Sequence, residues 1–138
     1  MSDPNDRNQQ VIEEFRANEG QVGGFFADKQ LLLLHTIGAK SGQPRINPLV
    51  TMPDGDRWII IASKAGAPSH PDWYYNLVAN PQVSIEVGTE KVAVTATVAD
   101  EPERSELYAK IAAKYDFFAE YAQKVTTRVI PVIILTRR

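Results

Sequence analysis

Residues 82–98, QVSIEVGTEKVAVTATV, decide the fold class of this 138-residue chain. Over residues 82–87 apolar side chains alternate with polar ones, and the alternation returns over residues 92–98, after Gly88 and Thr89. Alternation of this kind is typical of strands with one buried face. The stretch therefore predicts two half-buried strands joined by a turn.

Short apolar runs between turn residues predict four further strands. They cover residues 30–36, 45–52, 57–63 and 129–136. Asp54-Gly55 is a strong hairpin signal, because glycine adopts positive φ at little cost, and it predicts that the strand at 57–63 pairs back on the strand at 45–52. Pro131 has no backbone N–H to donate, so we expect it at a sheet edge or at a bulge.

Three or four helices are predicted around these strands, over residues 6–18, 71–79, 100–115 and 117–125. Asp100 followed by Glu103 matches the capping-box pattern, with Asp100 as the N-cap. No GxGxxG motif follows a strand and no regular βαβ rhythm appears, which argues against a doubly wound sheet. The sequence therefore predicts a mainly β fold, an antiparallel β-barrel with peripheral helices.

The composition restricts the function. The length suits one domain over residues 1–138, with residues 1–28 as an N-terminal helical extension. A formal charge of −2 gives no global basic field for nucleic acid. The chain has no cysteine, which excludes disulfides, zinc–thiolate sites and thiol nucleophiles and agrees with a cytoplasmic location. Its longest apolar runs, residues 31–34 and 132–135, are far too short to span a membrane.

The first candidate site is the turn at residues 38–45, GAKSGQPR. It lacks the spacing of a P-loop, because Leu33 stands where the Walker pattern needs its first glycine. Its backbone N–H groups and the side chains of Lys40, Ser41 and Arg45 suit an anion. An ordinary solvated turn between strands has the same composition.

Basic residues are concentrated in one part of the chain. Residues 29–64 contain five basic and two acidic side chains, a net +3 in a chain of −2. Two basic turns, around Lys40 and Lys64, each follow a predicted strand. If those strands are neighbours, their ends converge on one anionic ligand, for which a phosphate or carboxylate tail is suitable.

Two further segments are candidate sites. Residues 63–77 run from a loop of small residues into a helix start, where backbone N–H groups can meet phosphate, although the aromatic residues there equally suit core packing. Residues 115–121 contain four aromatic side chains, which suit either a packed helix face or the wall of an aromatic ligand pocket. His35 and His70 lack metal-ligand spacing, so no metal site is expected.

Three segments resemble one family, in order along the chain. Residues 31–49, LLLLHTIGAKSGQPRINPL, are similar to a family strand followed by the signature T-x-G-x-K-[ST]-G-x-P-R-x-x-P-L. Residues 62–81 are similar to a second signature, and residues 116–121 with 126–132 to an aromatic helix and closing strand. On these residues the chain resembles the deazaflavin-dependent nitroreductase family of F420H2-dependent oxidoreductases.

The resemblance implies a split β-barrel similar to FMN-binding barrels and coenzyme F420 as the cofactor. It implies hydride transfer from the reduced deazaflavin to a small organic acceptor: a quinone, an enone or unsaturated lactone, or a nitro compound. The cofactor-binding residues that it implies are Lys40, Ser41, Arg45, Ile46, Asn47, Pro48, Leu49, Val50, Ile61, Ala62, Ser63, Lys64, Asp72, Trp73, Tyr74, Tyr75 and Asn76.

The resemblance also implies residues on the acceptor side. Ser63 and Tyr121 are the catalytic candidates, as hydrogen-bond donors to the acceptor, and Val50, Tyr115, Phe118 and Tyr121 are the substrate-binding candidates. Some family members have tyrosines where this chain has Val50 and Phe118. We therefore expect a more apolar acceptor pocket than in the nitroreductase type.

Two other functions remain open at this point. One is a non-enzymatic deazaflavin-binding or carrier protein on the same fold, because the sequence contains no certain catalytic acid or base. The other is an FMN-dependent oxidoreductase, because the barrels are related. Neither a nucleic-acid partner nor a membrane span is expected, and no feature of the sequence predicts an oligomeric state.

Overall fold

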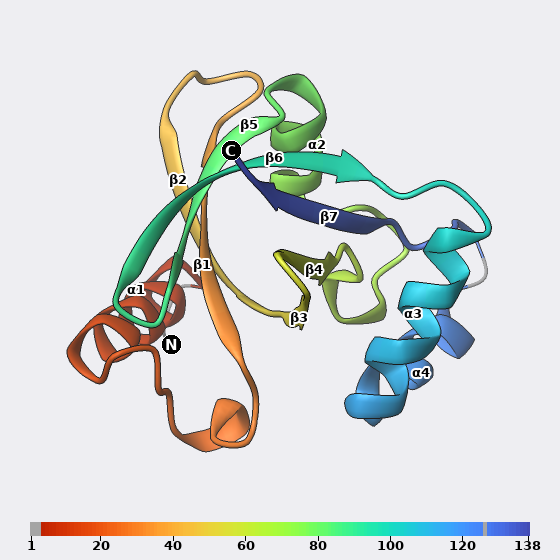
Figure 1. Cartoon of the computed structure of the whole chain (residues 1–138), viewed down its shortest axis with the longest axis horizontal. Helices are drawn as coiled ribbons and strands as arrows, with labels where there is room; N and C mark the ends of the chain where they lie inside the picture. Colours follow the sequence, from red (N-terminus) through yellow and green to blue (C-terminus); the bar gives the residue numbers. More distant parts are fainter. Residues whose placement is uncertain (1–3, 126) are drawn as a thin grey trace.

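A computed structural model of the chain describes residues 4–125 and 127–138, and its main feature is a curled sheet of seven strands (Figure 1). The strands are β1 (Leu31–Ile37), β2 (Pro44–Val50), β3 (Met52–Asp54), β4 (Arg57–Ile61), β5 (Gln82–Val87), β6 (Glu90–Val98) and β7 (Val132–Arg137). Their order is β2-β1-β5-β6-β7-β4-β3, and every neighbouring pair is antiparallel. The prediction of a mainly β, barrel-like fold is confirmed.

Four α-helices and two 3-10 turns surround the sheet in the described residues. They are α1 (Pro4–Ala17), η1 (Gly24–Phe26), η2 (Lys64–Gly66), α2 (Asp72–Ala79), α3 (Glu103–Lys114) and α4 (Asp116–Lys124). The predicted N-terminal extension at residues 1–28 contains α1 and η1, and its residues 1–3 lie outside the described residues. Thr126, in the last segment of the family resemblance, also lies outside them.

Thr51 joins the two edges of the curled sheet. β2 and β3 lie at opposite ends of the strand order, yet only Thr51 separates them in the chain. The backbone N–H of this buried residue donates to the carbonyl of Gln30 (2.9 Å), and its hydroxyl donates to the carbonyl of Ile59 (2.9 Å). The predicted single strand over residues 45–52 is therefore wrong: β2 pairs with β1, and only β3 forms the hairpin with β4.

The apolar run in β1 is buried on both faces of the sheet. Leu32 and Leu34 point into the interior with residues of β4 to β7 and α2, whereas Leu31 and Leu33 pack under α1. A third cluster lies between α3, α4 and the outer face of β4 and β7. A strand covered on both faces needs no polar alternation, which explains why the LLLL run is a strand.

Two local predictions are wrong for physical reasons. Pro131 lies directly before β7, an interior strand, so its missing N–H falls outside the ladder, and its carbonyl accepts from the N–H of Ala62 (3.0 Å). The N-terminus of α3 is not capped by Asp100. Instead the carboxylate of Glu101 accepts from both the N–H (2.8 Å) and the hydroxyl (2.7 Å) of Ser105.

Candidate functional site

The turn between β1 and β2 is compact and internally hydrogen-bonded. The N–H of Gly38 donates to the carbonyl of Gln43 (2.8 Å), and the N–H of Gly42 donates back to Gly38 (2.9 Å). The hydroxyl of Ser41 accepts from the N–H of Gln43 (3.2 Å) and lies so close to Gly38 that a Cβ there would meet it at 2.4 Å. Glycine is therefore required at position 38 for Ser41 to close the turn.

Asn76 of α2 fixes this turn to the rest of the molecule. Its side-chain oxygen accepts from the N–H of Ala39 (2.9 Å), and its amide nitrogen donates to the hydroxyl of Thr36 (3.1 Å). Both side chains of this second pair are buried. Asn76 is a predicted cofactor residue; in the structure its amide shapes the turn that carries Lys40.

The idea that two neighbouring strands bring the basic turns together is wrong. β1 and β4 are separated in the sheet by β5, β6 and β7. Instead α2, which follows the second basic turn in the chain, reaches the first turn through Asn76. A helix therefore makes the connection that was expected from the sheet.

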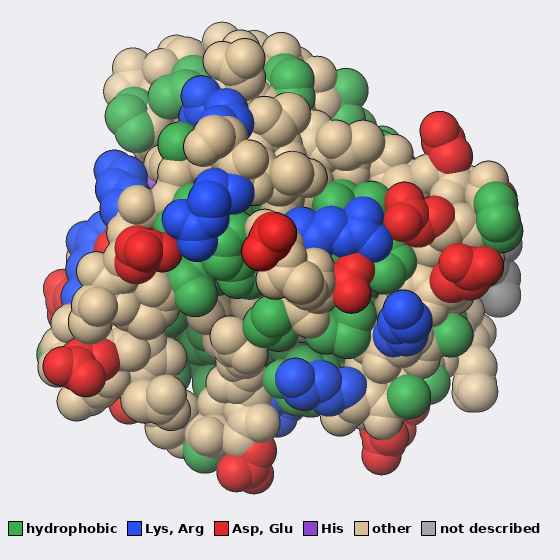
Figure 2. All heavy atoms as spheres, in the orientation of Figure 1, with side chains coloured by type: hydrophobic (Ala, Val, Ile, Leu, Met, Phe, Trp, Pro, Cys, Tyr) green, Lys and Arg blue, Asp and Glu red, His purple; other side chains and the backbone are tan. Residues whose placement is uncertain are grey.

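The basic charges in residues 29–64 are not equally available. Arg57 is held by Asp54 (2.8 Å) and Glu103 (3.1 Å), so it is neutralised away from the turns. Lys40 and Arg45 are exposed, and neither forms an ion pair within the part of the chain that the structure describes. Charges of both signs are interspersed on the face shown in Figure 2, so these local cations matter more than the net charge.

The loop at residues 62–70 follows β4 and contains the second group of candidates. Ser63 is buried, and its carbonyl accepts from the N–H of Gly66 (3.0 Å) in η2. Lys64 has a backbone φ of +49°, in the left-handed region that residues other than glycine rarely adopt. Strained positions of this kind occur preferentially in functional loops, which supports Lys64 as a candidate.

Arg128 is a residue of this region that the sequence reasoning missed. Its guanidinium donates to the carbonyls of Ala62 (3.1 Å), Ser63 (2.8 Å) and Ala67 (3.0 Å) and approaches Nδ1 of His70 (3.0 Å). The residue is 58 or more positions away in sequence from each of these partners, and no local motif marks it. His70, which the sequence analysis considered only as a metal ligand, therefore has Arg128 as a partner.

The rings of α2 differ in exposure. Trp73 is buried in the interior cluster, Tyr74 is half-buried and Tyr75 is 49% exposed. The ring of His70 lies 4.7 Å from Tyr74 and 5.8 Å from Tyr75 between centroids. Core packing is thus the main role of Trp73, and the tyrosines remain at the surface beside the loop.

The aromatic cluster of α4 lies against the 62–70 loop. A Cβ built on Gly66 would meet the Tyr121 ring at 3.3 Å and Lys124 at 3.0 Å, so backbone and ring are in close contact. Tyr121 also packs edge-on against Phe117 and Phe118. Burial, with a smaller effect of Glu120, raises the pKa of the Tyr121 hydroxyl, so it remains a protonated donor at neutral pH.

The other residues that were predicted to bind the organic acceptor lie around this cluster. Phe118 is buried, and the buried Tyr115 accepts through its hydroxyl from the N–H of Gln30 (3.1 Å). Val50, at the end of β2, packs against both the α1 cluster and the α3–α4 cluster. The predicted residues of β2, Ile46, Asn47, Pro48 and Leu49, are half-buried, while Ile61 and Ala62 are buried and Asp72 is exposed.

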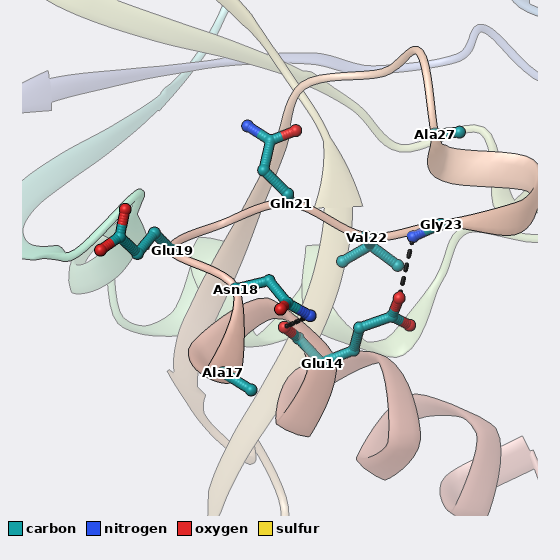
Figure 3. A pocket seen from close by; sticks show the side chains of 8 residues that line it. All are labelled: Glu14, Ala17, Asn18, Glu19, Gln21, Val22, Gly23 and Ala27. Atoms are coloured by element: carbon teal, nitrogen blue, oxygen red, sulfur yellow. Dashed lines mark hydrogen bonds between the residues drawn. The ribbon is translucent and has the colours of Figure 1, made fainter.

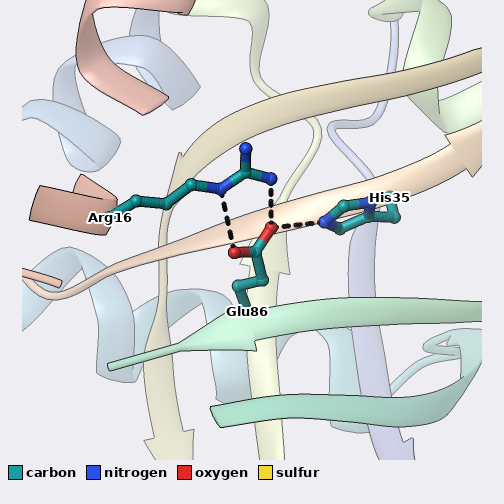
Figure 4. A network of polar contacts seen from close by, with 3 residues as sticks. All are labelled: Arg16, His35 and Glu86. Atoms are coloured by element: carbon teal, nitrogen blue, oxygen red, sulfur yellow. Dashed lines mark hydrogen bonds and ion pairs between the residues drawn. The ribbon is translucent and has the colours of Figure 1, made fainter. Parts of the chain in front are cut away.

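Two other polar features lie away from these loops. A shallow hollow of about 590 Å³ lies between α1 and the segment before β1, lined by residues such as Glu14, Asn18 and Gln21 (Figure 3). Glu86 of β5 binds Arg16 of α1 through two contacts and His35 of β1 (2.6 Å) (Figure 4). Neither contains a candidate residue of the turns described above, and no group of three acidic or histidine side chains in residues 4–125 and 127–138 is arranged to hold a metal.

Comparison with known proteins gives matches along most of the chain. A family described as F420H(2)-dependent quinone reductase matches residues 7–137. An F420H(2)-dependent quinone reductase of Mycobacterium tuberculosis is 40% identical over 131 residues, which cover 90% of this chain and 85% of that protein. A solved structure titled F420-H2 dependent reductase has 39% identity and a TM-score of 0.70, covering 76% of this chain and 92% of its own. A second, titled a domain-swapped dimer, has 33% identity and a TM-score of 0.72, covering 96% and 99%.

Proposed function

Because this chain belongs to the F420H(2)-dependent quinone reductase family, we infer that it is an oxidoreductase that uses reduced coenzyme F420 to reduce an organic acceptor. The match over residues 7–137 is the observation that carries this function. It includes the β1–β2 turn, the 62–70 loop and α4. The FMN alternative rests only on a related fold and is the less favoured reading.

The described residues fit an anionic cofactor with an aromatic ring system. Lys40 and Arg45 present exposed cations that the described side chains leave without a carboxylate partner. The shape of the β1–β2 turn is set by hydrogen bonds, because Asn76 and Ser41 each accept from one of its backbone N–H groups. We assign the charged tail of the cofactor to Lys40, Ser41 and Arg45, and its ring to the side of β2 and the 62–70 loop.

The bound cofactor supplies the hydride, and the protein supplies binding, orientation and a donor for the acceptor oxygen. Negative charge develops on that oxygen as hydride arrives. A donor already aimed at it stabilises the transition state more than the ground state. Ser63 and Tyr121 are the proposed donors, since the 62–70 loop, which contains Ser63, contacts Tyr121 at Gly66.

The acceptor side favours quinones over nitro compounds. Phe118 and Val50 contribute no hydroxyl, and the side chain of Tyr115 is buried, with its hydroxyl held at the N–H of Gln30. The remaining surface around Tyr121 is mostly apolar and aromatic, which suits a flat quinone ring.

Spectral titration of the purified apoprotein with F420 and with FMN tests the cofactor. We expect tighter binding of F420, followed by oxidation of the reduced form when a quinone is added. Binding without turnover over a panel of quinones, enones and nitro compounds would favour the carrier alternative. Equal or tighter binding of FMN would favour the flavin alternative.

No helix in the described ranges is long and apolar enough to cross a membrane. We place the enzyme in the cytoplasm on the basis of its cysteine-free composition, and cell fractionation tests this placement.

A further inference from the structure

Arg128 lies between α4 and β7, and all the N–H groups of its guanidinium contact one loop, residues 62–70. Nε and Nη2 both donate to the carbonyl of Ala67, at 3.3 and 3.0 Å. Nη2 also donates to Ser63, and Nη1 donates to Ala62 and approaches Nδ1 of His70. A guanidinium has five N–H donors, and these five contacts use all of them.

The contacts of Arg128 indicate that it shapes the 62–70 loop and does not itself bind a ligand. Because all five N–H donors are used, Arg128 has none left to bind a phosphate of the cofactor or the organic molecule that is reduced. Nor does it form an ion pair with any carboxylate in residues 4–125 and 127–138. Because an arginine stays protonated, a positive charge that only carbonyls and an imidazole nitrogen contact lies against the 62–70 loop.

The contact with His70 fixes the state of its ring. Arg128 can only donate, so Nδ1 of His70 must accept, which leaves the ring neutral with its proton on Nε2. Burial, and then the charge of Arg128, lower the pKa of His70, in agreement with a neutral ring. The same ring contacts Tyr74 and Tyr75, so the arrangement extends from the loop into the first turn of α2.

We propose that Arg128 is a positioning residue, which through its planar fork holds the 62–70 loop and neutral His70 in the shape that binds the cofactor. This inference rests on the proposed function, because the cofactor is assigned there to Ser63, Lys64 and the start of α2. Lysine cannot replace the fork, since one ammonium cannot reach three carbonyls and an imidazole with the same geometry.

Arg104 provides a matched control. It is also a half-buried arginine, and it donates through Nε (3.0 Å) and Nη2 (2.8 Å) to the carbonyl of Ile130, two residues from Arg128. It stacks on Tyr108, and its side-chain hydrogen bonds within the described residues go to Ile130 and not to the loop. Arg104→Met therefore removes the same type of contact from the same segment without touching the loop.

The first experiment uses the apoprotein and does not depend on activity. The N–H groups of Gly66 and Ala67 are hydrogen-bonded within the loop, so their hydrogen exchange reports on its shape. Arg128→Met and the milder Arg128→Lys should each speed exchange at these two amides by about tenfold or more, while Arg104→Met leaves them near wild type. Equal protection in Arg128→Lys and Arg104→Met overturns the proposal.

The second experiment measures affinity for oxidised F420. If the loop keeps its competent shape about one tenth of the time in Arg128→Met, the apparent Kd rises about tenfold, with a much smaller change in kcat at saturating cofactor. An affinity equal to that of Arg104→Met, at matched melting temperature, would refute a positioning role. If wild-type protein itself failed to bind F420, the proposed function would fall, and the exchange comparison would still decide what Arg128 does to the loop.

Discussion

Replacing Gly66 with alanine tests the contact between the 62–70 loop and the proposed donor Tyr121. Gly66 has φ of +80°, and a Cβ there lies 3.0 Å from Lys124 and 3.3 Å from the Tyr121 ring. The lysine contact is with a flexible side chain and is easily relieved. The ring belongs to a packed aromatic cluster, so it must move by a few tenths of an ångström or push the loop away.

The expected magnitude has two separable parts. Placing a side chain in the left-handed region costs about 1 kcal/mol of unfolding free energy, and crowding the ring adds roughly another 1 to 2. For a chain of this length that total lowers the melting temperature by about 6 to 10 °C. Since a 1 Å displacement of a catalytic group can cost about a hundredfold in rate, a few tenths should slow hydride transfer by roughly tenfold.

Gly55→Ala is the control for strain alone. Gly55 has φ of +62°, with no atom within 4 Å of its built Cβ, so it carries the backbone cost without the contact. We expect Gly55→Ala to lose about 1 kcal/mol of stability and to transfer hydride at the wild-type rate. Stopped-flow single-turnover oxidation of the reduced cofactor and thermal unfolding should be measured on the same preparations.

A double variant identifies the path of the effect. If Gly66→Ala acts through Tyr121, adding it to Tyr121→Phe should cause little further loss of rate, because the two substitutions disturb one interaction. Fully additive losses, or a Gly66→Ala enzyme as fast as Gly55→Ala, would contradict the assignment of Tyr121 as a donor next to this loop.

Three other predictions concern the β1–β2 turn, the proposed donors and the contacts of Glu86. Lys40→Ala and Arg45→Ala should each weaken F420 binding by roughly 10- to 150-fold, and wild-type affinity should fall as salt rises; unchanged affinity in isothermal titration would leave an ordinary solvated turn. Ser63→Ala or Tyr121→Phe should slow single-turnover hydride transfer by about a hundredfold with cofactor affinity near wild type, and normal transfer in both would exclude the donor role. The contacts of Glu86 lower the pKa of its carboxyl from 4.5 to about 2, so they stabilise the fold above about pH 5 and lose this effect as pH falls from 4.5 to 2. Glu86→Gln should therefore cost on the order of 2 kcal/mol in urea unfolding at pH 7 and less than half of that at pH 3, and an equal loss at both would show that the charge is not responsible.

The elements of the sheet were largely predictable because their signals are local. Alternation predicted β5 to the residue, and Asp54-Gly55 predicted the hairpin between β3 and β4. The break at Thr51 was not predictable, because it depends on one residue that bonds both Gln30, next to β1, and Ile59 of β4, and these two strands are not neighbours in the sheet. The prediction of the α3 cap was wrong because Asp100 and Glu101 both carry a carboxylate that can accept from the first turn, and the sequence pattern does not distinguish them.

The site shows the same division between local and distant information. The cations and glycines of the β1–β2 turn are adjacent in sequence, so a pattern found them, but the pattern assigned their meeting with the 62–70 loop to neighbouring strands. Three side chains fix these segments in place: Asn76 of α2 binds the turn, whereas Tyr121 of α4 and Arg128, which follows α4, contact the 62–70 loop. Asn76 and Arg128 bind residues that lie 37 to 66 positions away in the sequence. Tyr121 meets the loop at Gly66, a residue that has no side chain to mark the contact in the sequence. Arg128 is the clearest case, because from the sequence an arginine between a helix and a strand is interpreted as a solvent-exposed cation. Its role becomes visible only in the folded structure, where the carbonyls of Ala62, Ser63 and Ala67 all accept from its guanidinium.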